Sequence, residues 1–195
     1  MQYPSRFIDY LRLNFFQIRK ADKYCMNCKI IDNFLDNDTF LSIQNEIYGV
    51  TFPWFQNDHV VFPAADKTDT WSWQLTHVFY LAMASQSHCF SALDPIIKKL
   101  NPSAILRIKA NLLPRADKII EHGFHTDITH FKGKTAIYYI NSNNGFTVFE
   151  DGSKVESIAN RMVIFDSTIN HTGTTCTDAR NRCVINFNYY EWDFD

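Results

Sequence analysis

The 195-residue sequence lacks any run of about 18 apolar residues, so no transmembrane helix and no membrane partner are expected. It also lacks an excess of positive charge, because 19 Lys and Arg residues stand against 21 Asp and Glu residues. A strongly basic nucleic-acid footprint is therefore not expected. No stripe alternates basic with aromatic residues, so single-stranded nucleic acid is not supported as a partner.

We also expect no secretory signal, because Asp9, Arg12 and Asn14 interrupt the N-terminal segment. The five cysteines are an odd number, spread widely along the chain. We therefore expect reduced thiols and a cytoplasmic location. A lone C-x-x-C motif, Cys25 to Cys28, has no second ligand pair, so no zinc site is expected there.

What the sequence does contain is enough apolar material for one domain with a real core. Hydrophobic residues make up 46% of the chain and aromatic residues 15%, which excludes a disordered protein. Apolar residues at helical spacing predict an amphipathic helix over residues 1–24. We expect an N-terminal helical extension, 1–28, followed by a single domain, 29–195.

Within that domain, helices come first and strands follow, with the boundary after Pro102. Residues 29–102 are predicted as helical support: a short strand at 29–34, then helices after Asp36 or Asp38, over 74–87 and around 90–100. The strands predicted for 103–195 are 104–112, 119–125, 135–140, 145–150, 161–166 and 182–192. This order indicates an α+β fold closed by an antiparallel barrel or sandwich.

One constellation in the strand-rich half has the residue types of a metal site. In an extended segment, His125 and Asp127 share one face and His122 points to the other. His171 follows the apolar strand 161–166 and a short loop, a position from which it would join them. Two histidines and one carboxylate are the ligand set of non-haem Fe(II) oxygenases, which leaves coordination positions open.

A cation belongs to the same pattern. Arg182 opens the apolar terminal strand, and an arginine pointing into a barrel needs a partner, because burying an unpaired charge is costly. A dicarboxylate co-substrate would supply that partner by a two-pronged ion pair. Arg180, two residues earlier, is the competing anchor.

The two histidines, the aspartate and the arginine, with the strands around them, resemble the 2-oxoglutarate/Fe(II)-dependent oxygenase superfamily in its prolyl-4-hydroxylase-like branch. Within that branch, the sequence is similar to small oxygenases encoded by tailed bacteriophages. The resemblance covers most of the strand-rich half and excludes residues 1–28. It rests on residues 107–112, 125–127, 135–141, 145–152, 161–173 and 182–190.

The resemblance implies a double-stranded β-helix, or jelly-roll, in which His125, Asp127 and His171 bind Fe(II). It implies that Arg182 binds the far carboxylate of 2-oxoglutarate and that Tyr139 donates a hydrogen bond to the same carboxylate. With O2, such an enzyme hydroxylates a C–H bond of a second substrate. Peptidyl proline is the nearest precedent, so a protein or peptide partner is favoured, in the host cytoplasm if the chain is phage-encoded.

Three other functions remain open. One is a jelly-roll isomerase or epimerase without a redox metal, and another is a non-catalytic metal-binding module. The third is a zinc hydrolase that uses His125, His130 and His171. The substrate mouth is expected to include residues 52–62 and 128–134.

Overall fold

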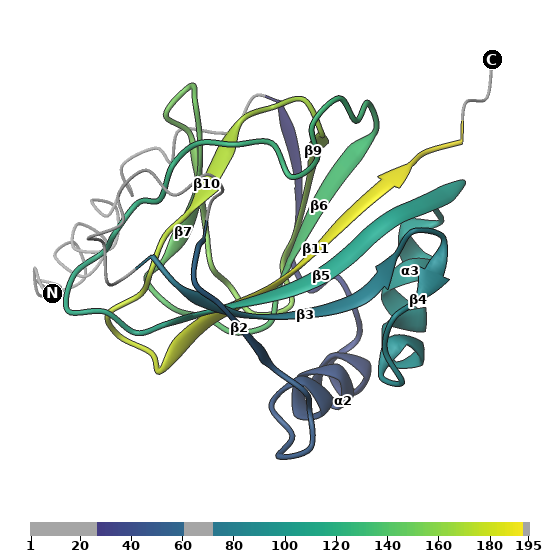
Figure 1. Cartoon of the computed structure of the whole chain (residues 1–195), viewed down its shortest axis with the longest axis horizontal. Coiled ribbons are helices and arrows are strands. Elements are labelled where there is room, and N and C mark those ends of the chain that lie inside the picture. Colours follow the sequence, from purple (N-terminus) through teal and green to yellow (C-terminus); the bar gives the residue numbers. More distant parts are fainter. Residues whose placement is uncertain (1–26, 61–71, 193–195) are drawn as a thin grey trace, which may run out of the picture.

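The computed structural model describes residues 27–60 and 72–192 (Figure 1). The helix predicted over 1–24 lies outside these ranges. Chain order begins with strand β1 (Cys28–Ile31), helix α2 (Asn37–Ile47), strands β2 (Phe55–Asn57), β3 (Gln74–Leu81) and β4 (Ala84–Ser85), the 3₁₀ turn η1 (Phe90–Leu93) and helix α3 (Asp94–Leu100). It continues with β5 (Ala104–Pro114), β6 (Lys134–Tyr139), β7 (Phe146–Phe149), β8 (Lys154–Glu156), β9 (Met162–Asp166), β10 (His171–Gly173) and β11 (Asn181–Tyr190).

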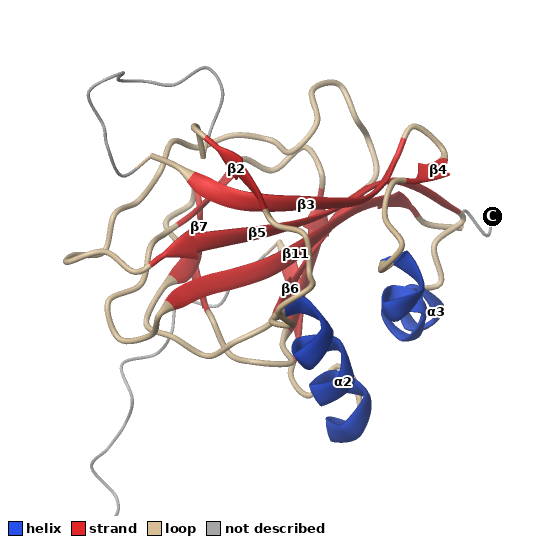
Figure 2. Ribbon diagram, turned by 60° about the horizontal axis from the view of Figure 1, so that its bottom comes forward, coloured by secondary structure: helices blue, strands red, loops and turns tan. Residues whose placement is uncertain are grey.

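The strands form two antiparallel sheets. Over the described residues, the larger sheet has eight strands in the order β1-β9-β6-β11-β5-β3-β2, with β4 paired to β3. The smaller sheet has the order β10-β7-β8. Helices α2 and α3 cover one face of the larger sheet (Figure 2), and the smaller sheet packs on its other face through Phe149 and Val155. Two facing antiparallel sheets are the architecture of the predicted jelly-roll.

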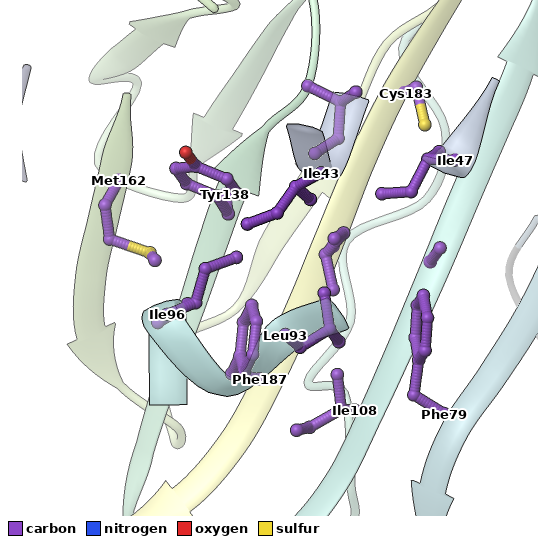
Figure 3. Close-up of a cluster of buried hydrophobic side chains, with 14 of the residues drawn as sticks. Ile43, Ile47, Phe79, Leu93, Ile96, Ile108, Tyr138, Met162, Cys183 and Phe187 are labelled. Atoms are coloured by element: carbon purple, nitrogen blue, oxygen red, sulfur yellow. The ribbon is translucent and has the colours of Figure 1, made fainter. Parts of the chain in front are cut away.

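The alternation of residues along β11 explains how one sheet serves two cores. Cys183, Ile185 and Phe187 belong to the cluster under the helices (Figure 3). Val184, between them, belongs to the cluster between the two sheets. Because successive side chains of a strand point to opposite faces, Arg182 joins Val184 on the inter-sheet side, and that side holds the site described below.

Two of the predicted helical segments are present. Asp36 caps α2 by accepting a hydrogen bond from the backbone N–H of Thr39 at 3.0 Å, and the helix buries Phe40, Ile43 and Ile47. The segment around 90–100 forms η1 and α3. It ends at Asn101, whose positive φ of 49° is a left-handed cap.

The helix predicted over 74–87 is wrong, because residues Gln74–Leu81 form strand β3. Its backbone pairs on one side with β2 and on the other with β5, where Leu75 faces Leu112. The β-branched and aromatic residues of this segment suit an extended backbone between two neighbours. Residues 29–102 therefore supply strands to the larger sheet as well as the helices that support it.

The strand predicted over 119–125 is also wrong. This segment meets β10 and its continuation only through the isolated bridges Glu121–Thr174 and His125–His171. Threonine hydroxyls make further links: Thr175 Oγ1 accepts from the N–H of Ile120, and Thr172 Oγ1 donates to the carbonyl of His122. Side chains have thus replaced part of the ladder that a regular strand would form.

The described cysteines differ in state. Cys89, Cys176 and Cys183 are buried free thiols, as expected. Cys28 is disulfide-bonded, which contradicts the expectation of a reduced thiol at that position. Among the described residues, no helix is both long and apolar enough to cross a membrane.

Candidate functional site

His125, Asp127 and His171 converge on one point between the sheets. One ligand atom from each lies within 4.8 Å of the others. The backbones of the two histidines fix this meeting, because each donates its N–H to the carbonyl of the other at 3.0 Å. The ring centroids are consequently 5.1 Å apart. The structure therefore brings together all three predicted ligands.

Each imidazole is oriented by a local carbonyl. Nδ1 of His125 lies 3.0 Å from the carbonyl oxygen of Gly123, and Nδ1 of His171 lies 3.3 Å from that of Ile169. A protonated Nδ1 that donates to a carbonyl leaves Nε2 with the lone pair that a metal requires. Burial lowers the pKa of His171, against the opposing charge of Asp127, so this ring is held neutral.

Asp127 is held from behind by three side chains. Arg107 forms an ion pair with its carboxylate at 3.1 Å, and Asn186 and Asn188 donate amide hydrogen bonds at 3.0 to 3.3 Å. Burial alone would raise the pKa of Asp127. The charge of Arg107, the charge that His171 carries at the acidic pH where this carboxyl titrates, and the bond from Asn188 together outweigh burial and lower this pKa to about 2. The carboxylate is therefore ionised, as a metal ligand must be.

The donor set fits a divalent metal such as Fe(II). Two imidazole nitrogens and a carboxylate oxygen match the ligand chemistry of non-haem Fe(II) sites. Among the described residues, His125, Asp127 and His171 form the one group of three potential ligand side chains that lie close enough to share an ion. His130 lies outside it, so the ligand set of the zinc hydrolase alternative does not form.

The site has two poles: the three candidate metal ligands form one, and Arg182 forms the other. Its side chain is 3% exposed, and it donates from Nε to Ser157 Oγ at 2.8 Å and from Nη2 to Thr147 Oγ1 at 3.0 Å. Burial lowers its pKa, and none of the ion pairs among the described residues involves it. A Cβ added at Gly173 would lie 3.0 Å from Nη1, so glycine leaves this guanidinium its space.

Tyr139 lies next to Arg182 and Thr147 but does not line the cavity. Its hydroxyl hydrogen-bonds to Thr147 Oγ1 at 2.7 Å, and its ring centroid is 5.6 Å from the guanidinium carbon of Arg182. Thr147 lines the cavity, whereas Tyr139 is not among its lining residues. Arg180, the competing anchor, is exposed and is also absent from the lining.

A cavity of about 70 Å³, open to solvent, joins the two poles. Its lining includes His125, Asp127 and His171 at one end and Arg182 at the other. Val60, from the predicted mouth 52–62, contributes to the wall, but no residue of 128–134 does.

Sequence reasoning missed the polar residues that support this cavity. Arg107, Lys109 and Asn111 lie at alternate positions of β5, and Asn186 and Asn188 do so on β11. Polar residues at every second position of an otherwise apolar strand are the available signal, because they occupy one face. The sequence does not show, however, that Arg107, Asn186 and Asn188 all contact Asp127, which only the fold brings to them.

No family model and no curated protein matches the sequence. The fold does match solved structures, among them a Pseudomonas putida prolyl-4-hydroxylase at TM-score 0.54, 15% identical and covering 85% of this chain and 93% of the other. A Trichoplax adhaerens prolyl hydroxylase, solved with a hypoxia inducible factor peptide, matches at TM-score 0.55, 13% identical, over 98% and 94% of the two chains.

A third similar structure is the non-haem α-ketoglutarate-dependent epimerase SnoN of nogalamycin biosynthesis. It matches at TM-score 0.55, 11% identical, over 85% of this chain and 78% of that one, and it has also been solved with Fe3+ and α-ketoglutarate. At these identities the likeness shows the fold. The predicted jelly-roll, shared with 2-oxoglutarate/Fe(II) oxygenases, is thereby confirmed.

Proposed function

We propose that this protein is a non-haem Fe(II)- and 2-oxoglutarate-dependent dioxygenase that hydroxylates a C–H bond of an amino-acid side chain. One observation carries the proposal. The cluster of His125, Asp127 and His171 lies at one end of a cavity whose other end holds Arg182, a buried cation without an acidic partner among the described residues. That pairing suits a metal bound to a dicarboxylate.

In this proposal, His125 and His171 hold Fe(II) through Nε2, and Asp127 holds it through a carboxylate oxygen. The carbonyls of Gly123 and Ile169 keep both rings in the required tautomer. Arg107, Asn186 and Asn188 keep the carboxylate ionised and fixed. Three protein ligands leave coordination positions for the co-substrate and O2.

Arg182 would bind the far carboxylate of 2-oxoglutarate, and Thr147, whose hydroxyl accepts from Arg182 and which lines the cavity, would help to hold it there. When bound, Fe(II), 2-oxoglutarate and O2 supply the oxidising chemistry, yielding succinate, CO2 and a hydroxylated product. The protein positions these groups and excludes water. Ile137, Val184 and Leu113 provide the apolar wall between the two poles.

For the second substrate, peptidyl proline is the precedent to test first, because two of the similar structures are named prolyl hydroxylases. An epimerase is the second candidate, since SnoN shares the fold. The two differ in product: hydroxylation adds one oxygen atom to the substrate, whereas epimerisation leaves its mass unchanged.

The test is Fe(II) binding by anaerobically purified protein, followed by succinate release from 2-oxoglutarate in air. His125→Ala and Asp127→Ala should each abolish both. His130→Asn is the matched control: this exposed histidine lies outside the cluster at φ 61°, a conformation that asparagine tolerates. Succinate release that survived in both alanine variants would refute the proposal, and indifference to iron would support a metal-free isomerase.

A further inference from the structure

The wall of the cavity beside the metal ligands carries a cation that the proposed chemistry does not use. Lys109 on β5 is the direct cross-strand partner of Asn186 on β11, and both side chains line the cavity. Lys109 is half-buried. Its ammonium group appears in none of the ion pairs or side-chain hydrogen bonds formed among the described residues.

The nearby carboxylate, that of Asp127, already has a counter-charge and hydrogen-bond donors. Asp127 is paired with Arg107 and accepts bonds from Asn186 and Asn188. If the proposed function holds, 2-oxoglutarate brings two negative charges, of which Arg182 takes one and the metal the other. Lys109 is then left as a shielded positive charge without a counter-charge, an arrangement that is costly until an anion arrives.

Two hydrogen-bond acceptors beside Lys109 are also unmet. Oδ1 of Asn186 and Oδ1 of Asn111 are buried, line the same wall and have no hydrogen-bond partner. The orientation of Asn186 is fixed, because its Nδ2 donates to Asp127. A buried acceptor without a donor costs about 1–3 kcal/mol, and no described group donates to either of these two oxygens.

2-Oxoglutarate does not complete this wall. At neutral pH both of its carboxyl groups are ionised, so it carries acceptors and no N–H or O–H donor. A ligand that satisfies the wall must bring one anionic group for Lys109 and N–H donors for Asn111 and Asn186. The zwitterion of a free α-amino acid has both, in its carboxylate and its ammonium group. A residue inside a peptide has neither charge.

We propose that Lys109, Asn111 and Asn186 recognise the second substrate, and that this substrate is a free α-amino acid. The carboxylate binds Lys109, and the ammonium group donates to Asn111 Oδ1 and Asn186 Oδ1. These contacts place the side chain of the amino acid toward the metal ligands. The inference rests on the proposed function and specifies its substrate class, in place of the peptidyl precedent.

The test is a binding measurement that needs no turnover. The full chain is loaded with Mn(II) and 2-oxoglutarate without O2 and titrated calorimetrically with the twenty free L-amino acids and with their N-acetyl amides. At least one free amino acid should bind, with its blocked form at least about tenfold weaker. Binding of the blocked form as tightly, or of no free amino acid, overturns the inference.

Variants separate the wall from the co-substrate site. Lys109→Met should weaken the amino acid at least about tenfold and leave the affinity for 2-oxoglutarate unchanged, and Lys132→Met, at an exposed loop lysine, should change neither. If Lys109→Met weakens 2-oxoglutarate instead, Lys109 is a co-substrate anchor and the inference is wrong.

Asn111→Leu gives a second readout that survives if Lys109→Met fails to fold. It should weaken the amino acid but raise the Tm of the ligand-free protein, because it removes an unmet acceptor. Unchanged amino-acid binding in this variant contradicts the role of Asn111. A wild-type chain that binds neither Mn(II) nor 2-oxoglutarate refutes the proposed function, whereas one that binds both and no amino acid refutes this inference alone.

Discussion

The guanidinium of Arg107 lies 3.1 Å from a carboxylate oxygen of Asp127, with the two side chains 17% and 7% exposed. Arg107 also donates from Nε to Asn188 Oδ1, and Asn188 in turn donates to Asp127. The candidate metal-ligating carboxylate thus belongs to a closed polar network before any metal arrives. That network compensates the charge of Asp127, which burial would otherwise disfavour.

The first prediction concerns this ion pair. Arg107→Met should destabilise the metal-free protein by about 3–5 kcal/mol at pH 7, because it leaves Asp127 buried without its counter-charge. The double variant Arg107→Met/Asp127→Asn should recover most of the loss. Urea unfolding of the wild type, the single variants Arg107→Met and Asp127→Asn, and the double variant measures the coupling, and strictly additive losses would contradict it.

The same pair gives a metal-dependent signature. Mn(II) should raise the Tm of Arg107→Met by more than it raises that of the wild type, because the ion supplies the missing positive charge. Arg180→Met, at an exposed arginine, is the control and should respond as the wild type does. An equal Tm shift in Arg107→Met and the wild type would show that Arg107 does not offset the charge of Asp127.

A further prediction concerns Arg182. Arg182→Met should raise the KM for 2-oxoglutarate by about 10–100-fold, because a charged hydrogen bond contributes roughly 1.5–3 kcal/mol. Arg180→Met should leave that KM unchanged, since Arg180 does not line the cavity. Succinate release against 2-oxoglutarate concentration measures both, and the reverse ranking would make Arg180 the anchor.

The sequence predicted those parts of the site that depend on the alternation of side chains along an extended segment. The spacing of His125 and Asp127 predicts a shared face, and their ligand atoms do converge with that of His171. The place of Arg182 at the start of an apolar strand predicts an inward cation, and the side chain is buried in the cavity wall. These predictions needed only local periodicity.

The other features could not be predicted, because they depend on pairing between segments that are far apart in the sequence. Gln74–Leu81 is a strand because β2 and β5 flank it, and its own sequence does not name those neighbours. The segment 119–125 joins a distant segment through two isolated bridges and two threonine hydroxyls rather than a continuous ladder, and its own sequence indicates neither. Likewise, Arg107 is 20 positions from Asp127, and no sequence period links them.

The pKa of His171 predicts a pH dependence of stability in the metal-free protein. Burial lowers this pKa below the usual value, so near pH 6 the unfolded chain binds more protons at His171 than the folded protein does. The free energy of unfolding should therefore fall as the pH drops from 7 through 6.5 and below. His171→Gln should flatten this part of the profile, measured by urea unfolding in the presence of a chelator. Equal slopes in the two proteins would contradict the assignment.

The last prediction separates Tyr139 from Thr147. Their hydroxyls are bonded at 2.7 Å, but only Thr147 both contacts Arg182 and lines the cavity. Thr147→Val should therefore raise the KM for 2-oxoglutarate by about tenfold, by removing a direct contact and an acceptor of Arg182. Tyr139→Phe should change that KM by less than about threefold, because Thr147 keeps its bond to Arg182. If Tyr139→Phe has the larger effect, the tyrosine reaches the co-substrate directly, as the family resemblance implies, and the two hydroxyls must rearrange when 2-oxoglutarate binds.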